Sequence, residues 1–189
     1  ADEYVPKFEK DDTGKWTANT LKSSNPLIGA LGVFILFFGW FGFNGGSLLA
    51  IMQRSDGVLT SRAGIYGRVL VNTMMAGSIA SLFAFFLGRI ANRDQIYFKW
   101  SLNDLLNGLL AGLVCITPGA AYVDVWHAIW YGLIGAVVYK GVSVLLASPR
   151  LRIDDPVDGI AVHGACGAMG MLLTGCFAVP AYCAQVHPG

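Results

Sequence analysis

The stretch PLIGALGVFILFFGWFGFNGGSLLAIM, from Pro26 to Met52, contains no charged residue. A helix of about 20 apolar residues is long enough to cross the hydrocarbon core of a bilayer. Pro26 is well placed to begin such a helix, because the N–H that proline lacks would have no partner in the first turn. We therefore predict a transmembrane helix over Pro26–Met52.

Four further apolar segments of similar length follow along the chain. They are Tyr66–Ile90, Leu102–Ala121, Val125–Ala147 and Val157–Ala178. The Leu102 segment is the weakest, because Thr117, Pro118 and Gly119 interrupt its end. Asn103 or Asp104 could cap that segment, and Asp154 or Asp155 with Pro156 could open the last one.

Composition places the chain in a membrane. Only 13% of its 189 residues are charged and the mean hydropathy is +0.55, whereas soluble domains carry about 25% charged residues. The net charge of +1 provides no basic field, so we exclude nucleic acid as a partner. The fold class expected is an all-α, multi-pass integral membrane protein with about five transmembrane helices.

Basic residues are distributed unevenly between the two sides of the predicted bundle. The side that holds the N-terminus carries Lys7, Lys10, Lys15, Lys22, Arg89, Arg93, Lys99, Arg150 and Arg152. The opposite side carries Arg54, Arg62 and Arg68. This bias predicts that the N-terminus faces the cytoplasm, or the matrix or stroma of an organelle.

Three parts of the chain are expected to differ in character. Residues 1–25 form a polar N-terminal segment, residues 26–180 the transmembrane domain and residues 181–189 a short tail. Because the chain begins at Ala1, we expect either that a targeting peptide has been removed or that the chain is part of a longer product.

Two ionisable side chains lie inside apolar segments. His163 is about 13 Å along a helix from Asp154, and it could line a pathway, take part in packing or bind a metal or pigment. Lys140 lies about 10 Å from the end of its helix, so its ammonium group could extend to the surface or pair with a buried carboxylate.

Aromatic and glycine residues alternate late in the first predicted helix, in GWFGFNGGS (Gly39–Ser47). Such aromatics could form a movable stopper and attract a cation through their ring faces, with the Ser47 hydroxyl as a further ligand. A belt of aromatics at the membrane interface is the alternative interpretation. In the last helix, Gly164, Gly167 and Gly170 recur every third residue and predict close packing against another helix.

The remaining chemistry of the sequence is sparse. We expect the four cysteines to be small buried residues, with a Cys176–Cys183 disulfide as the alternative. His127, between Trp126 and Trp130, could be a packing residue or a pigment ligand. Without a nucleophile beside a base, paired carboxylates or metal spacing, we expect neither an enzyme, a metal nor a cofactor.

Four strings, in order along the chain, resemble signatures of the sixth, seventh, eighth and tenth helices of Amt (Amt/Mep/Rh) ammonium transporters. They are GWFGFNGGS (39–47), VNT (71–73), NGLLAGLVCITPGAAYV (107–123) and DDPVDGIAVHGACGAMGMLLTGCFA (154–178). The resemblance implies one half of an Amt-type bundle, in which inverted repeats enclose a pathway.

The resemblance also implies roles for individual residues. Phe43 matches a gate phenylalanine, Ser47 the serine of the outer ammonium site, His163 the second of two pore histidines and Trp40 an aromatic near the pore. The family's first five helices, with the other pore histidine, have no counterpart here.

Two functions are compatible with this half-transporter. We expect a structural or accessory subunit of a larger membrane complex, for which an organellar inner membrane is one candidate location. Other subunits of the complex and lipids are expected to cover the face around His163. The alternative is one half of a split channel that conducts ammonium or ammonia with a partner chain.

Overall fold

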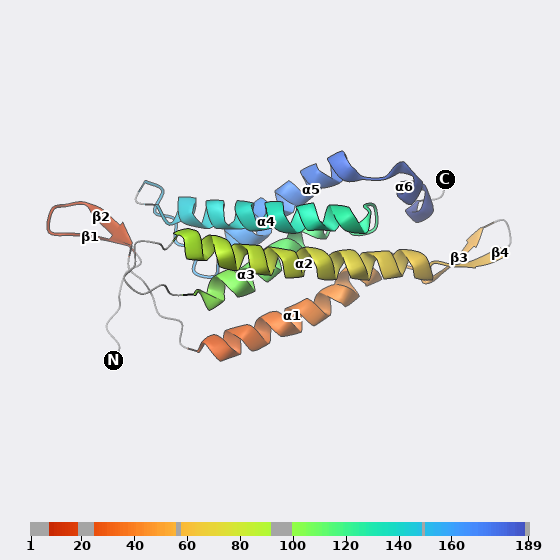
Figure 1. The fold of residues 1–189 in the computed structure, drawn as a ribbon, viewed down its shortest axis with the longest axis horizontal. Coiled ribbons are helices and arrows are strands. Elements are labelled where there is room, and N and C mark those ends of the chain that lie inside the picture. The colour runs from red at the N-terminus through yellow and green to blue at the C-terminus, as the bar shows by residue number, and fades with distance from the viewer. Residues whose placement is uncertain (1–7, 19–24, 56–57, 92–99, 149, 188–189) are drawn as a thin grey trace.

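The computed structural model describes residues 8–18, 25–55, 58–91, 100–148 and 150–187. Its long helices lie side by side and run alternately from one end of the molecule to the other (Figure 1). They are α1 (Pro26–Gly46), α2 (Ala63–Ala91), α3 (Leu102–Ile116), α4 (Val125–Leu146) and α5 (Cys166–Phe177). A π-helical turn, η1 (Ile160–Ala165), leads directly into α5, and a short α6 (Pro180–Val186) follows.

Within the described residues, four helical segments are long and apolar enough to cross a membrane: Pro26–Gly46, Ala63–Ile90, Val125–Leu146 and Ile160–Phe177. The fifth apolar helix, α3, has 15 residues. It ends at Ile116 instead of the predicted Ala121, because Thr117 closes it and a series of turns follows. The polytopic all-α class is therefore confirmed, with α3 shorter than predicted.

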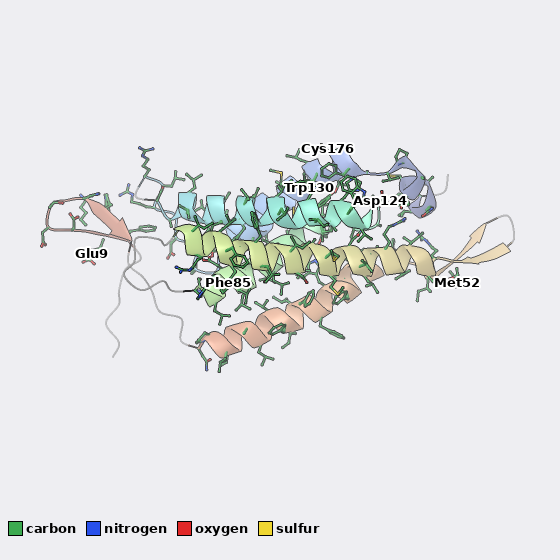
Figure 2. The ribbon with its side chains drawn as sticks, in the orientation of Figure 1. Glu9, Met52, Phe85, Asp124, Trp130 and Cys176 are labelled. Carbon is green, nitrogen blue, oxygen red and sulfur yellow. The ribbon has the colours of Figure 1, made fainter. Side chains whose placement is uncertain are left out.

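The predicted end of α1 at Met52 is wrong. The helix ends at Gly46, and Leu49 adopts a positive φ of 61°, which cannot continue a helix. Met52 instead begins the antiparallel hairpin of β3 (Met52–Ser55) and β4 (Val58–Ser61), which the apolar pattern did not predict. Figure 2 places Met52 at the end of the bundle opposite Glu9.

The predicted helix caps are partly confirmed. The N-cap of α3 is Ser101, whose hydroxyl accepts from the backbone N–H of Asp104 at 3.1 Å, so the prediction of Asn103 or Asp104 is wrong. Asp155 does open the last helical segment, since its carboxylate accepts from the N–H groups of Gly159 at 2.7 Å and Ile160 at 2.8 Å. Both caps satisfy N–H groups that the first helical turn leaves without partners.

The core lies where α2, α3 and α4 pack together. Small residues let the helices approach closely: Ala76, Ala80 and Ala84 of α2 are fully buried, and a Cβ at Gly112 of α3 would overlap the backbone of Ala76. Close backbone approach replaces the hydrophobic force that lipid does not provide between helices. In contrast, α1 contacts α2 and α3 over a small part of its surface, and most of its large side chains are exposed.

A second hairpin, β1 (Phe8–Lys10) with β2 (Trp16–Ala18), lies at the N-terminal end. Its turn is organised by Asp11, whose Oδ1 accepts from the Thr13 hydroxyl at 2.6 Å and from the N–H groups of Thr13 at 3.0 Å and Lys15 at 2.9 Å. The Thr13 hydroxyl, followed by the Lys15 N–H, lowers the pKa of Asp11 below its ordinary value. These bonds stabilise the ionised carboxylate.

We predict that acid opens this turn. Because the pKa of Asp11 is lower in the folded hairpin, its contribution to stability is present above the pKa of the unfolded chain and is lost as the pH falls through the folded pKa. An NMR titration should give an Asp11 midpoint below the ordinary aspartate value, and the protection of the Thr13 and Lys15 amides, measured relative to their intrinsic exchange rates at each pH, should fall as Asp11 is protonated. A midpoint at or above the ordinary value would contradict the prediction, and Asp11→Asn should show fast exchange at neutral pH.

Candidate functional site

An open apolar groove runs between α1 and the η1–α5 segment, with a volume of about 890 Å³. We call it the α1–α5 groove. Its lining comes from α1 (Ile35, Leu36, Gly39, Trp40, Phe43), from the end of α3 (Val114, Thr117, Pro118) and from η1–α5 (His163, Gly164, Gly167, Ala168, Met171). Trp40, Phe43 and His163, three of the four pore residues that the resemblance implies, therefore meet in one place, together with Gly164 and Gly167.

Trp40 is the best-fixed side chain of the groove. Its indole Nε1–H donates to Oγ1 of Thr117 at 2.9 Å, and the Thr117 hydroxyl donates in turn to the carbonyl of Leu113 at 2.7 Å. Because the hydroxyl proton is used on Leu113, Oγ1 is free to accept from the indole. This chain of hydrogen bonds sets the orientation of the Trp40 ring.

The ring of Trp40 contacts the rings of both Phe43 and His163. Its centroid is 5.9 Å from that of Phe43, at an interplanar angle of 57°, and 6.5 Å from that of His163, at 27°. His163 is exposed to the groove, and within the described part of the chain its imidazole contacts Trp40 and makes no hydrogen bond. Both ring nitrogens of His163 thus remain available to a small polar solute.

Ser47 lies outside the α1–α5 groove. Its hydroxyl donates to the carbonyl of Phe43 at 2.6 Å, and the residue lines a second cavity of about 520 Å³. Thr117 and Pro118 border both cavities, so Ser47 and His163 lie on the two sides of the turn that ends α3. Phe43, 60% exposed, lies in the groove and accepts the Ser47 bond through its backbone.

The three glycines of the last helix have different surroundings. A Cβ at Gly170 would overlap the backbone carbonyl of Cys115 in α3. A Cβ at Gly167 would come within 3.7 Å of Val114, an ordinary contact, and one at Gly164 would meet only Ile160 of its own segment. The packing role of these glycines stays a prediction, for which Gly170 has the tightest geometry.

Lys140 pairs with a buried carboxylate. Its Nζ lies 2.6 Å from Oδ1 of Asp104, and the side chains are 20% and 7% exposed. Of the two alternatives for Lys140, the buried partner is confirmed and extension of the ammonium group to the surface is wrong. The sequence offered Asp104 only as a helix cap, so this pairing was missed.

The other candidates of the sequence differ in their surroundings, and His127 is consistent with a packing role. His127 is buried between the rings of Trp126 and Phe177, at centroid distances of 3.7 and 5.0 Å. All four cysteines are free, so the Cys176–Cys183 disulfide is wrong. Cys115 and Cys166 are buried, as small apolar residues would be, whereas Cys176 is exposed.

Comparison with known proteins identifies the family to which the chain with this groove belongs. The sequence profile of the Ammonium Transporter Family matches residues 7–189. The chain belongs to the ammonium transporter family. The match begins within the polar N-terminal segment and includes all the residues of the α1–α5 groove.

Individual proteins that are similar to this chain support its place in the ammonium transporter family. It is 38% identical over 180 residues to "Ammonium transporter 1 member 1" of Oryza sativa subsp. japonica, covering 94% of this chain and 34% of that protein. The protein of the same name from Solanum lycopersicum is 36% identical over 181 residues, covering 95% and 35%. The chain thus spans about a third of the length of these relatives.

Solved structures show the same fold. "Sensor Amt Protein" superposes with a TM-score of 0.74 at 35% identity, covering 92% of this chain and 38% of that one. Saccharomyces cerevisiae Mep2 gives 0.72 at 29% identity, covering 86% and 32%. The curated relatives are named ammonium transporters, and this chain is an integral membrane protein that corresponds to part of a transporter.

Proposed function

We propose that the α1–α5 groove is one wall of an ammonium or ammonia pathway, closed by a second wall that corresponds to the first five helices of the relatives. The observation that carries this proposal is the alignment of His163 with Trp40 and Phe43 in an open apolar groove. Family membership supplies the substrate, since the relatives are named ammonium transporters.

The chemistry of the groove suits this substrate. The faces of Trp40 and Phe43 attract a cation. On the other side of the Thr117–Pro118 turn, the hydroxyl oxygen of Ser47 can accept a hydrogen bond from ammonium. Deeper in the groove an apolar lining disfavours a charged ion, so ammonium has to lose its proton there. A neutral imidazole at His163 can donate from one nitrogen and accept at the other, which allows it to hold ammonia or to relay the proton.

A structural role is the second candidate, and the exposed surface of α1 favours it. Leu31, Phe34, Ile35 and Phe38 are each at least 60% exposed, and Gly164 and Gly167 leave the facing side of η1–α5 smooth. Other subunits of a membrane complex, for example an organellar one, or lipid can cover such a surface. In this case the chain would be an accessory subunit and the groove a docking surface.

We also propose an orientation. The end that carries the β1–β2 hairpin, the C-terminus of α4 and the start of η1 faces the cytoplasm, matrix or stroma. The support for this is the excess of basic residues on that side of the sequence.

Reconstitution distinguishes the two functions. The chain is incorporated into liposomes alone and together with a fragment of a full-length relative that contains its first five helices, and uptake of methylammonium is measured. We expect uptake only when both are present, and a loss of at least about 100-fold for His163→Ala, the lower end of the range for losing one proton-transfer group.

The matched control is Leu172→Ala, which removes an exposed side chain from the same helix without touching the groove. Its uptake should equal that of the unmodified pair. If the two pieces assemble, as shown by co-purification, but His163→Ala has the same uptake as Leu172→Ala, His163 does not line the pathway. Assembly without any uptake would favour the structural role.

A further inference from the structure

A network of polar side chains lies at the start of η1, away from the α1–α5 groove. Its centre is the carboxylate of Asp158, which accepts hydrogen bonds from three helical side chains. Oδ2 accepts from Nδ2 of Asn107 at 3.0 Å and from the hydroxyl of Tyr139 at 3.3 Å, and Oδ1 accepts from Ser143 at 2.7 Å. One carboxylate thereby connects the beginning of η1 to both α3 and α4.

The same network includes the buried ion pair. The Tyr139 hydroxyl lies within 3.5 Å of Asp104 Oδ1 as well as near Asp158, and Asp104 binds Lys140. The single phenolic proton can serve either carboxylate, so Tyr139 bridges the two. Such networks are stiff when their members are satisfied, because an unpaired buried polar group is costly.

The backbone at Asp158 is also unusual. Its φ is +53°, a left-handed conformation that asparagine, aspartate and glycine tolerate better than other residues. The N–H groups of Gly159, Ile160 and Ala161 all bind the Asp155 carboxylate. The N–H of Val162 binds the carbonyl of Asp158 at 2.8 Å. The chain therefore enters η1 in a fixed direction, five residues before His163.

The far end of the segment is fixed as well. Gly170 lies against the backbone of Cys115, and Thr174 binds the hydroxyl of Tyr131 at 2.9 Å. The π-helical turn, which fits an extra residue into the helix, lies between these two fixed points and contains His163. A change of one residue in register rotates a helical side chain by about 100°, so the orientation of His163 depends on both ends.

We propose that Asp158 is a positioning residue for His163: its carboxylate, held by Asn107, Tyr139 and Ser143, fixes the start of the π-helical turn and so directs the imidazole toward Trp40. Ala161 and Val162, which are buried, transmit this constraint, because they pin the inner side of the turn immediately before His163. The importance of this position for transport rests on the proposed function, whereas the geometric statement does not.

The test uses the full chain in lipid nanodiscs, with histidine labelled for NMR. The imidazole signals of His163 are assigned by their loss in His163→Ala, and the ring-current effect of Trp40 is measured by its loss in Trp40→Leu. Asp158→Gly keeps the left-handed backbone without strain but removes the carboxylate. We expect it to move the His163 signals toward their positions in Trp40→Leu.

Two comparison variants separate the carboxylate from its surroundings. Asp158→Asn keeps the shape and most hydrogen bonds, so its His163 signals should stay close to those of the unmodified chain. Asp154→Gly changes an exposed aspartate of the same loop that makes no hydrogen bond to any described residue, and should leave the signals unchanged. The signals of His127 and His187 report whether each variant is folded.

The proposal is overturned if folded Asp158→Gly leaves the His163 signals in place. If Asp158→Gly does not fold, Ser143→Ala, which removes only the bond to Oδ1, must produce a smaller shift in the same direction, and no shift would again overturn the proposal. In the reconstituted pair, Asp158→Gly should lose uptake about 100-fold, as His163→Ala does, because a misplacement of about 1 Å can cost that much. Asp158→Asn should stay within about twofold of the unmodified pair, since it keeps the geometry. The NMR result stands even if the pair does not conduct.

Discussion

Replacing Lys140 by methionine should lower the free energy of unfolding by about 3–5 kcal/mol, the usual cost of removing one partner of a buried ion pair. Methionine fills similar space but leaves the Asp104 carboxylate, 7% exposed, without its cation. The Tyr139 hydroxyl, 3.5 Å from Oδ1, is a neutral donor and cannot replace the lost charge. Unfolding in detergent micelles, followed by circular dichroism over increasing denaturant, measures the change.

Two further variants make this result specific. Arg150→Met removes an exposed basic residue just beyond the same helix and should change the stability by less than about 0.5 kcal/mol. The double variant Lys140→Met with Asp104→Leu should recover much of the loss, since an apolar pair of similar volume can replace a buried ion pair. If Lys140→Met is as stable as Arg150→Met, the ion pair contributes nothing to the fold.

The sequence predicts helices best where hydrophobicity alone decides them. The segments Val125–Ala147 and Tyr66–Ile90 correspond closely to α4 and α2, because a bilayer requires a long apolar run and nothing else competes there. The end of α1 was misjudged for the same reason. Residues 47–52 are as apolar as a helix, but the left-handed Leu49 and the pairing of β3 with β4 end it.

The site is only partly encoded in local patterns. The family resemblance selects Trp40, Phe43, Ser47 and His163, but no spacing rule shows that Trp40 binds Thr117, which is 77 residues away. From the sequence alone, Thr117 is expected only to interrupt a helix. A threonine at the end of an apolar run does indicate a hydrogen bond to another part of the chain, because a hydroxyl removed from water needs a partner.

The polar network was predictable in kind but not in detail. A lysine in an apolar segment suggests a carboxylate partner, yet several aspartates border the helices and hydrophobicity does not choose among them. The choice depends on the packing of α3 against α4, which brings Asp104 and Lys140 together across 36 residues. The π-helical turn at His163 is likewise set by contacts at both of its ends and has no local sequence signature.

Replacing Gly170 by alanine should destabilise the protein, whereas the same substitution at Gly175 should be neutral or stabilising. In a helix, alanine is favoured over glycine by about 1 kcal/mol, and a Cβ at Gly175 meets nothing within 4 Å. At Gly170 the new Cβ would overlap the carbonyl of Cys115, and a helix backbone cannot rotate away as a side chain could. We expect a loss of about 3 kcal/mol, the upper part of the range for overpacking.

The stability changes expected for Gly170→Ala and Gly175→Ala have opposite signs. This difference is decisive, because helix propensity and hydrophobicity change alike in both variants. Denaturant unfolding in the same micelles measures both, and the Cys115 thiol offers a second readout. If α5 is pushed away from α3, this buried thiol should react faster with a maleimide in Gly170→Ala than in Gly175→Ala. Equal stabilities and equal thiol reactivity would show that α5 does not depend on close backbone contact at Gly170.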